Sequence, residues 1–378
     1  MKNKRMKVLF LVNIPSPYRI SFFNELGKIC DLTVLFERRT SDERELEWFN
    51  NKIINFKAVF LDGLKINKDK ALSFSVIKFF KKNLYDFIII GGYATPTGMI
   101  AINYLKFKKI PFGLNADGGL IDNNEFIGKK MMKKYYISSA DFWLSSSKIT
   151  TDYFQYYGAN INQIYLYPFT TIFERDLIKK PIDSKIKWEL RNKLNISEEK
   201  VILSVGRFVY SKGFDVLLEA CTKIPKEYGV YIVGGEPTKE YGEFVRKFNL
   251  NNVHFIGFKS KEELKEYYMA SDLFVLPTRK DVWGLVINEA MCYGLPVITT
   301  DKCVSGLELV KDYENGFITP VNDSKNLAEK IRKVMKDNEL SAKMSKNNLI
   351  KIKKYTIENM AKETMEILES ILAERENN

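Results

Sequence analysis

Histidine and cysteine are scarce in this chain. Its 378 residues contain one histidine, His254, and four cysteines. The cysteines stand far apart, without the paired spacings of a zinc site or a disulfide framework, which favours a reducing compartment. A single imidazole also disfavours a Ser-His-Asp triad and a His-based metal site. Because His254 alternates with apolar residues in a predicted strand, we expect it to have a structural role.

Long apolar runs are also absent. No stretch approaches the ~20 apolar residues that a membrane-spanning helix needs. The basic residues 1–5 lead into a short apolar run at 8–14, which ends in Pro15-Ser16-Pro17 without a small-residue cleavage site. We therefore expect a first buried strand rather than a signal peptide, and a cytoplasmic protein.

Acidic residues are outnumbered by basic ones, mainly in the first half of the chain. The net charge is +12, and residues 1–178 hold 26 Lys and Arg against 17 Asp and Glu, or +9, which leaves +3 for the rest. Basic and large apolar residues occur together over 74–87 and 126–137. These stretches predict basic amphipathic helices, which either lie on an anionic membrane or are half-buried with a lysine-rich solvent face. No nucleic-acid-binding motif is visible, so we expect no nucleic-acid partner.

The chain repeatedly alternates short apolar strands with amphipathic helices. In the first half, strands are predicted at 8–12, 32–36, 87–90, 111–115 and 142–145, with helices among them. The alternation restarts at Val201, after a polar segment at 174–187. It favours an α/β protein with two doubly wound parallel sheets. We place an N-terminal domain at 1–178, a C-terminal domain at 179–355 and a last helix at 356–378.

The stretch 277–296, PTRKDVWGLVINEAMCYGLP, is the most informative part of the chain. A strand at 273–276 runs into a loop, and a helix is predicted to begin at 284–286. The first turn of such a helix has free backbone N–H groups and the positive end of the helix dipole, which together bind anions. Asp281 and Glu289 lie on either side of that turn. A ligand with an anionic centre and hydroxyl groups at both ends, such as a sugar nucleotide, fits this pattern.

A second strand, loop and helix support the same ligand. A β-branched strand at 201–205 leads through Gly206 to a helix at 214–221. The loop between them holds Arg207 and Lys212, which places two cations at the carboxyl end of a strand, where open α/β sheets bind ligands. Arg can grip a phosphate through two hydrogen bonds, and Lys acts as a point charge.

Together these segments resemble the nucleotide-binding half of glycosyltransferase family 4, the retaining group 1 enzymes of bacterial polysaccharide synthesis. The family usually has Glu at the first acidic position, where this chain has the shorter Asp281. A loop that is often glycine-rich in the family contains prolines here, at 13–19. The residues that match the family pattern are Gly206, Arg207, Lys212, Gly213, Gly257, Phe258, 270–272, Asp281, Gly284, Leu285, Val286, Glu289, Ala290, Met291, Gly294 and 296–298.

The resemblance implies the GT-B fold, in which two Rossmann-like domains face each other across a central cleft and the last helix crosses back to the N-terminal domain. It implies transfer of a sugar from a nucleotide diphosphate, UDP in preference to GDP, to a glycan or lipid-linked oligosaccharide acceptor of capsule, lipopolysaccharide or exopolysaccharide synthesis. No cofactor and no metal are expected, since no Asp stands two positions from another Asp. The basic N-terminal domain predicts a further partner, the anionic inner face of the cytoplasmic membrane.

The resemblance also implies a role for each site residue. Arg207 and Lys212 neutralise the leaving diphosphate, Glu289 holds the ribose and Asp281 holds the donor sugar. In the N-terminal domain, Asp117 follows a strand and is the candidate for contact with the reacting sugar or the acceptor hydroxyl, unless it only caps the turn after it. The remaining residues expected to border the nucleotide are Gly206, Gly257, Phe258, Thr278, Gly284, Leu285 and Val286.

Two other functions fit the same residues less well. A sugar-nucleotide epimerase or hydrolase on this fold needs acid and base groups around the sugar, and the chain offers one histidine and few carboxylates there. A non-catalytic basic module that binds a membrane would bind no nucleotide sugar. The sequence leaves open the donor sugar, the acceptor, the linkage and the oligomeric state.

Overall fold

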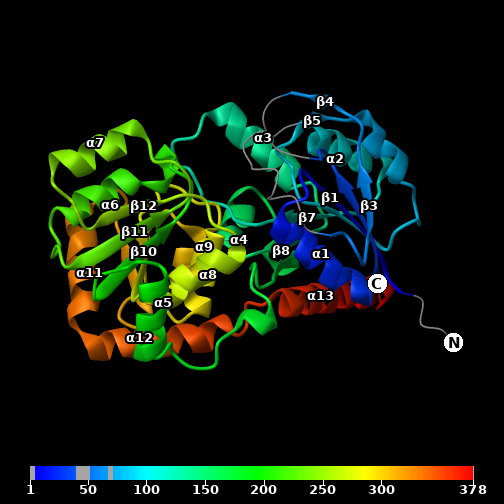
Figure 1. The fold of residues 1–378 in the computed structure, drawn as a ribbon. Coiled ribbons are helices and arrows are strands. Elements are labelled where there is room, and N and C mark those ends of the chain that lie inside the picture. Colours follow the sequence, from blue (N-terminus) through cyan, green and yellow to red (C-terminus); the bar gives the residue numbers. More distant parts are fainter. Residues whose placement is uncertain (1–4, 40–51, 67–70, 378) are drawn as a thin grey trace. The chain divides into compact units, whose positions relative to one another are not determined.

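The computed structural model describes residues 5–39, 52–66 and 71–377. They divide into two compact units (Figure 1), of which unit 1 comprises Met1–Thr171 with Thr356–Asn378 and unit 2 comprises Ile172–Tyr355. The sequence-based boundaries stand at 178/179 and 355/356. The main sheet of each unit is parallel, as the alternation of strands and helices predicts.

Unit 1 is built on a seven-stranded parallel sheet with the order β3-β2-β1-β6-β7-β8-β9. Its central strands are short β-branched and aromatic runs that are buried on both faces, as is typical of a sheet between two helical layers. The strands are β1 (Lys7–Val12), β2 (Asp31–Phe36), β3 (Lys57–Phe60), β6 (Phe87–Ile90), β7 (Gly113–Ala116), β8 (Phe142–Ser145) and β9 (Ile164–Leu166). A separate antiparallel ribbon pairs β4 (Leu64–Lys65) with β5 (Ala71–Leu72).

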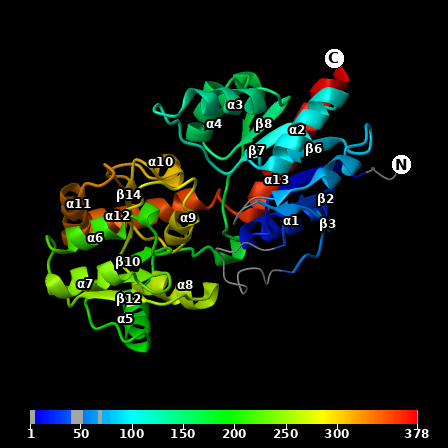
Figure 2. The same cartoon turned by 90° about the horizontal axis from the view of Figure 1, so that it is seen from above.

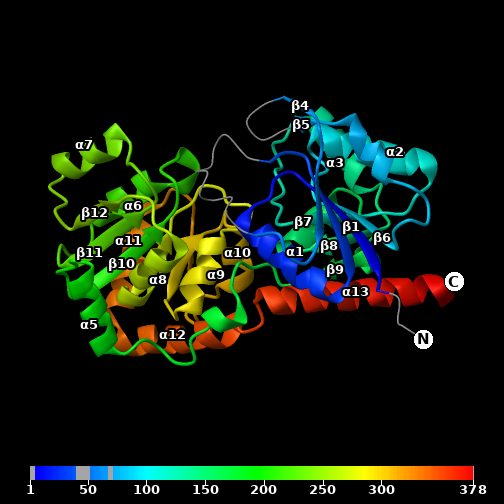
Figure 3. The same ribbon diagram turned by 45° about the vertical axis from the view of Figure 1, so that its right-hand side comes forward.

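The helices of unit 1 begin where the sequence provides caps. Thr95 caps one of them by accepting a hydrogen bond from the backbone N–H of Gly98 at 3.0 Å, and Pro96 is that helix's first residue. The helices are α1 (Pro17–Ile29), α2 (Pro96–Lys108), α3 (Ile127–Ile137), α4 (Lys148–Tyr156) and α13 (Ile357–Asn377). The last helix, α13, packs alongside α1 (Figures 1 and 3), which groups both ends of the chain in unit 1.

The prediction of a helix over 74–87 is wrong. The structure has only a short 3-10 helix, η2 (Phe74–Phe79), followed by turns. Ser73, the residue before it, donates its hydroxyl to the carbonyl oxygen of Asp62 at 2.5 Å and does not cap a helix. Without a cap, a run of aromatic and β-branched residues has little tendency to continue as an α-helix.

Unit 2 is built on a six-stranded parallel sheet with the order β12-β11-β10-β13-β14-β15. Its strands are β10 (Lys200–Val205), β11 (Tyr228–Val233), β12 (Val253–Ile256), β13 (Leu273–Leu276), β14 (Val297–Thr300) and β15 (Gly316–Thr319). Its helices are α5 (Ser184–Lys193), α6 (Phe214–Cys221), α7 (Lys239–Lys247), α8 (Lys261–Ala270), α9 (Leu285–Cys292), α10 (Val304–Leu309), α11 (Ser324–Lys336) and α12 (Asn338–Ile352). They pack in pairs (Figure 2): α6 with α11, α5 with α8, and α9 with α12.

Candidate functional site

Two loops meet at the carboxyl edge of the unit 2 sheet, because β10 and β13 are neighbours. The β10 loop ends in a short 3-10 helix, η5 (Tyr210–Lys212), and then Gly213, which has a φ of +67°. A Cβ atom on Gly213 would lie 2.1 Å from the carbonyl oxygen of Pro277, so only glycine permits this approach. Thr278 is fully buried and donates its hydroxyl to the carbonyl oxygen of Ser211 at 2.7 Å, which fastens the two loops together.

The structure brings Lys212 and Asp281 into contact. The Nζ atom of Lys212 lies 2.5 Å from Oδ2 of Asp281, and the two side chains are 20% and 16% exposed. The aliphatic part of Lys212 lies over Gly206, where a Cβ atom would stand 3.5 Å from its Cδ atom. Arg207 is exposed on the same loop. A cation and a carboxylate predicted from separate segments thus share one half-buried position.

The start of α9 lies directly after Asp281. Gly284 precedes the helix with a φ of +95°, and a Cβ atom there would lie 2.8 Å from the Sγ atom of Cys303. Among the described residues, the backbone N–H groups of Leu285 and Val286 have no hydrogen-bond acceptor. Two unpartnered donors at a helix N-terminus, next to a lysine, form a place where phosphate oxygens can bind.

Glu289 lies on the second turn of α9 and faces α8. It accepts a hydrogen bond from the Tyr268 hydroxyl at 2.9 Å, and burial raises the pKa of its carboxyl while that hydrogen bond opposes the shift. No described hydrogen bond or ion pair joins Glu289 to Asp281 or Lys212. After β12, Gly257 has open space around its Cα and Phe258 is exposed, so that flank of the edge is accessible.

Sequence reasoning missed Arg279, which ties the two loops together. Its guanidinium forms two hydrogen bonds to the Asp215 carboxylate, at 2.8 and 2.5 Å, and donates to the carbonyl oxygen of Tyr210 at 2.9 Å. It also lies 4.1 Å from the centre of the Tyr210 ring. Although burial opposes it, the hydrogen bonds from Arg279 lower the pKa of Asp215. The only signal in the sequence is a basic residue three positions after a buried strand.

In unit 1, Asp117 is already engaged. One carboxylate oxygen forms an ion pair with Arg19 of α1, and the other accepts the Tyr18 hydroxyl at 3.1 Å. Burial, and then the nearby Asp117 charge, raise the pKa of Tyr18 to about 12. Two residues earlier, Asn115 donates to the Tyr167 hydroxyl at 2.8 Å. Asp117 therefore belongs to a buried network with α1 and does not cap the turn that follows it.

Glu37, directly after β2, was also missed. It is 2% exposed and accepts the Thr95 hydroxyl at 2.6 Å through Oε1. Within the described part of the chain, its Oε2 atom has no hydrogen-bond partner. Burial raises the pKa of Glu37 to about 7. The available signal was its position, since an acidic residue that follows a buried strand in a parallel sheet stands at the ligand-binding edge.

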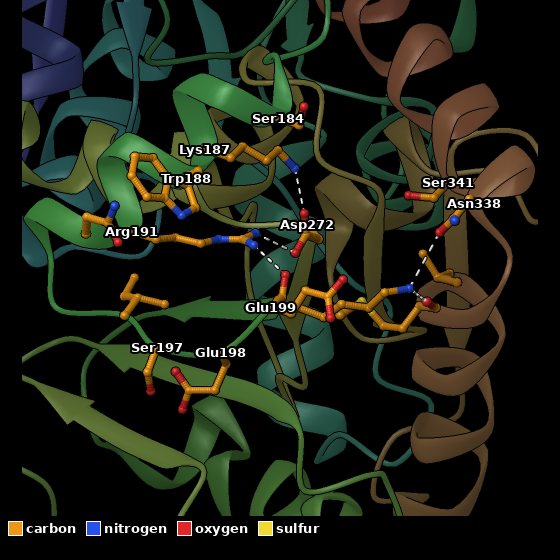
Figure 4. A pocket seen from close by; sticks show the side chains of 15 residues that line it. Ser184, Lys187, Trp188, Arg191, Ser197, Glu198, Glu199, Asp272, Asn338 and Ser341 are labelled. Atoms are coloured by element: carbon orange, nitrogen blue, oxygen red, sulfur yellow. Dashed lines mark hydrogen bonds and ion pairs between the residues drawn. The ribbon is translucent and has the colours of Figure 1, made fainter.

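A cavity of about 680 Å³ lies at the opposite, amino edge of the unit 2 sheet (Figure 4). There Asp272, just before β13, accepts hydrogen bonds from Lys187 and Arg191 at 2.7 Å each. This cavity holds none of the predicted site residues, and its Lys187, Arg191 and Asp272 side chains are paired with one another. We therefore assign the candidate site to the carboxyl edge.

His254 has the structural role that was predicted for it. Its ring stacks on Tyr231 at 4.5 Å between centres, and its Nε2 atom lies 2.7 Å from a carboxylate oxygen of Glu198. Across residues 5–39, 52–66 and 71–377, no three His, Cys, Asp or Glu side chains are grouped closely enough to hold a metal ion. No helix in those ranges is long and apolar enough to cross a bilayer.

Comparison with known proteins agrees with this site. The pattern of the family described as "Glycosyl transferases group 1" matches residues 186–350. An uncharacterized glycosyltransferase of Haemophilus influenzae is 32% identical over 183 residues, which are 47% of this chain and 51% of that protein. The chain spans about half the length of the first curated relatives it matches.

A longer match covers 72% of this chain and 74% of a Campylobacter jejuni protein, at 23% identity over 284 residues. That protein is named N,N'-diacetylbacillosaminyl-diphospho-undecaprenol alpha-1,3-N-acetylgalactosaminyltransferase.

The crystal structure of HepE from Anabaena in complex with UDP has a TM-score of 0.78 at 19% identity, over 97% of this chain and 100% of that one. This likeness, together with the two parallel sheets, identifies the fold as GT-B. The matched region, 186–350, contains the Lys212–Asp281 pair and the start of α9. Residues 186–350, which contain these site residues, thus match the group 1 glycosyl transferase family.

Proposed function

We propose that this protein is a retaining glycosyltransferase that moves a sugar from a UDP-sugar to a hydroxyl of a lipid-linked bacterial surface glycan. The Lys212–Asp281 pair carries the proposal, because it stands beside the two unpartnered N–H groups of α9. A diphosphate needs cations and N–H donors, and a sugar needs acceptors for its hydroxyls. This edge of unit 2 supplies both without a metal ion.

Donor binding exchanges the partners of the ion pair. The diphosphate takes the Lys212 ammonium and the α9 N–H groups, and Asp281 then accepts a hydroxyl of the donor sugar. Glu289 holds the ribose hydroxyls, with Tyr268 fixing its carboxylate. The base lies along the accessible flank at Gly257, Phe258 and the loop that Thr278 fastens.

The transfer step breaks the bond between the sugar C1 atom and the diphosphate oxygen. The acceptor oxygen forms its bond to C1 on the same face, and its proton passes to the leaving phosphate oxygen, so the products are UDP and the glycoside. Arg207 and Lys212 stabilise the negative charge that grows on the diphosphate. We assign the acceptor to unit 1, where Asp117 stands with Arg19 and Tyr18.

The substrate classes are supported by the relatives. The Campylobacter protein is named for a transfer to an undecaprenol-linked sugar, and HepE was crystallised with UDP. Both resemble this chain at low identity, so they favour UDP and a lipid-linked acceptor over other choices.

Titration calorimetry with UDP and GDP in the presence of a chelator tests the donor site. We expect saturable binding of UDP to the wild type, and a loss of about 1.5–3 kcal/mol of binding free energy in Lys212→Ala, the contribution of a charge-assisted hydrogen bond. Lys193→Ala is the matched control, because Lys193 also forms a 2.5 Å ion pair, with Glu266, but on α5. Equal UDP affinity in wild type and Lys212→Ala would contradict the diphosphate role.

We further propose that α3 places unit 1 on the anionic, cytoplasmic face of the membrane. Phe126, Ile127 and Met131 are 76%, 69% and 67% exposed, and Lys129, Lys130 and Lys134 are exposed on the same helix. Apolar side chains with lysines around them suit the headgroup region of a bilayer. Lys130 also lies 4.4 Å from the centre of the Tyr156 ring.

Vesicle sedimentation tests this contact. Vesicles that contain phosphatidylglycerol should retain the wild type at low salt and release it at high salt, because the attraction is screened. Phe126→Ser with Met131→Ser should abolish retention, whereas Phe107→Ser should not. Phe107 is a matched control, since it is 80% exposed on α2 of the same unit. Retention of the double variant at the wild-type level would refute the role of α3.

A further inference from the structure

Buried polar atoms without partners gather at the carboxyl edge of the unit 1 sheet. Four of these atoms belong to residues at the ends of three strands of this sheet: Ser16 Oγ and Arg19 Nη1 after β1, Glu37 Oε2 after the neighbouring β2, and Asn115 Oδ1 near the end of β7, which β6 separates from β1. All four residues are at most 5% exposed. Because buried polar groups are nearly always hydrogen-bonded, a cluster of unpaired ones in the described part of the unit indicates a missing ligand or solvent.

A pair of glycines lies between Glu37 and Asn115. A Cβ atom on Gly91 would stand 4.0 Å from Oδ1 of Asn115, and one on Gly92 would stand 3.9 Å from Oε1 of Glu37. The side chains of Glu37 and Asn115 therefore lie on either side of these two glycines, which directly follow β6. A Cβ atom on Gly92 would be in ordinary van der Waals contact with Thr95, at 3.5 Å, so a small group fits beside Glu37 without a clash.

The chemistry of the cluster indicates its ligand. Glu37 and Asn115 present oxygen atoms that accept hydrogen bonds, and Arg19 presents one donor whose charge is matched by Asp117. An anion would meet two carboxylates and only one free donor. A hydroxyl group both donates and accepts, so a neutral saccharide with several hydroxyls satisfies the cluster.

We propose that Glu37 is a specificity-determining residue of a saccharide site in unit 1, where its Oε2 atom hydrogen-bonds one hydroxyl of the sugar. The inference deepens the proposed function and rests on it in one respect, that this sugar belongs to the acceptor. The hydrogen bond from Thr95 fixes the Glu37 carboxyl in place. Because its pKa is raised to about 7, the carboxyl can donate as well as accept near neutral pH. Asn115 and Arg19 bind neighbouring hydroxyls from the other side of Gly91-Gly92.

Saturation-transfer NMR and calorimetry on the full chain test the site. The probes are the methyl glycosides of glucose, galactose, N-acetylglucosamine and N-acetylgalactosamine. We expect at least one to bind the wild type, and Glu37→Ala to weaken that binding about tenfold or more, as for a lost hydrogen bond to a carboxyl group. Gly92→Val should weaken it too, by filling the space beside Glu37. Glu25→Ala is the matched control, because Glu25 pairs with Lys28 on the outer part of α1.

UDP binding by each variant is measured in parallel. Wild-type UDP affinity in Glu37→Ala shows that unit 2 is folded, and a wild-type circular dichroism spectrum shows that unit 1 is folded too. Glycoside binding lost in such a variant supports the proposal. Glycoside binding that is absent from the wild type, or equal in Glu37→Ala, overturns it. If the wild type binds a glycoside through Glu37 but does not bind UDP, the proposed donor site is refuted and the proposed saccharide site is supported.

Discussion

Replacing Glu37 with glutamine should make the protein more stable, and more so at higher pH. Burial raises the pKa of Glu37 from 4.5 to about 7. Between those values the folded chain holds a proton that the unfolded chain has released. Unfolding therefore becomes easier as the pH rises through this window, and the loss is complete above the folded pKa.

The size of the effect follows from the shift. At about 1.36 kcal/mol per pKa unit, the raised pKa of Glu37 lowers the free energy of unfolding by about 3 kcal/mol at pH 8 and by about 1 kcal/mol at pH 5. Glutamine keeps the hydrogen bond from Thr95 and cannot ionise. The unfolding free energy of Glu37→Gln relative to wild type should thus rise by about 2 kcal/mol between these pH values.

Urea denaturation at pH 5 and pH 8, followed by circular dichroism, measures this difference. Glu25→Gln makes the same chemical change at a carboxylate that is ion-paired with Lys28, and serves as the matched control. A difference between Glu37→Gln and wild type that stays constant from pH 5 to pH 8 would refute the reasoning. It would show that Glu37 is solvated or has a partner in solution.

Three further changes test the loops around the donor site. Gly213→Ala should destabilise the protein by about 2 kcal/mol or more in urea denaturation, since its φ is +67° and its Cβ atom would meet the Pro277 oxygen at 2.1 Å. Arg279→Lys should lower UDP affinity with little change in stability, because Lys cannot form the two parallel hydrogen bonds to α6; unchanged affinity would exclude a positioning role. Tyr268→Phe removes the hydrogen bond that opposes the raised pKa of Glu289, so it should raise that pKa further and weaken UDP binding more as the pH falls; a loss that does not depend on pH would contradict this role of Tyr268.

Elements with a strong apolar pattern could be predicted from the sequence. β10, β13 and α6 were placed to within one residue because their side chains are almost all buried. By contrast, α5 begins within the stretch 174–187 that the sequence pattern indicated to be a polar connection. This helix buries no residue, so it has no apolar stripe to recognise.

The candidate site could be predicted only where it follows strand ends. Lys212 and Asp281 were expected at the same edge because each comes after a buried strand. The ion pairs that Arg19 and Arg279 form join residues 98 and 64 positions apart, and no local pattern reveals such partners. The free oxygen of Glu37 is likewise a property of packing, which depends on where Thr95 and Gly92 come to lie.

The contact between α1 and α13 has a consequence for synthesis on the ribosome. These helices complete unit 1 together, yet more than 300 residues separate them along the chain. At a translation rate of about 5–20 residues per second, roughly 15 to 65 s pass between the synthesis of α1 and that of α13. Unit 2 is translated whole within that interval. The nascent chain can therefore finish its second unit first, while an apolar surface of its first unit stays available to chaperones until α13 is made.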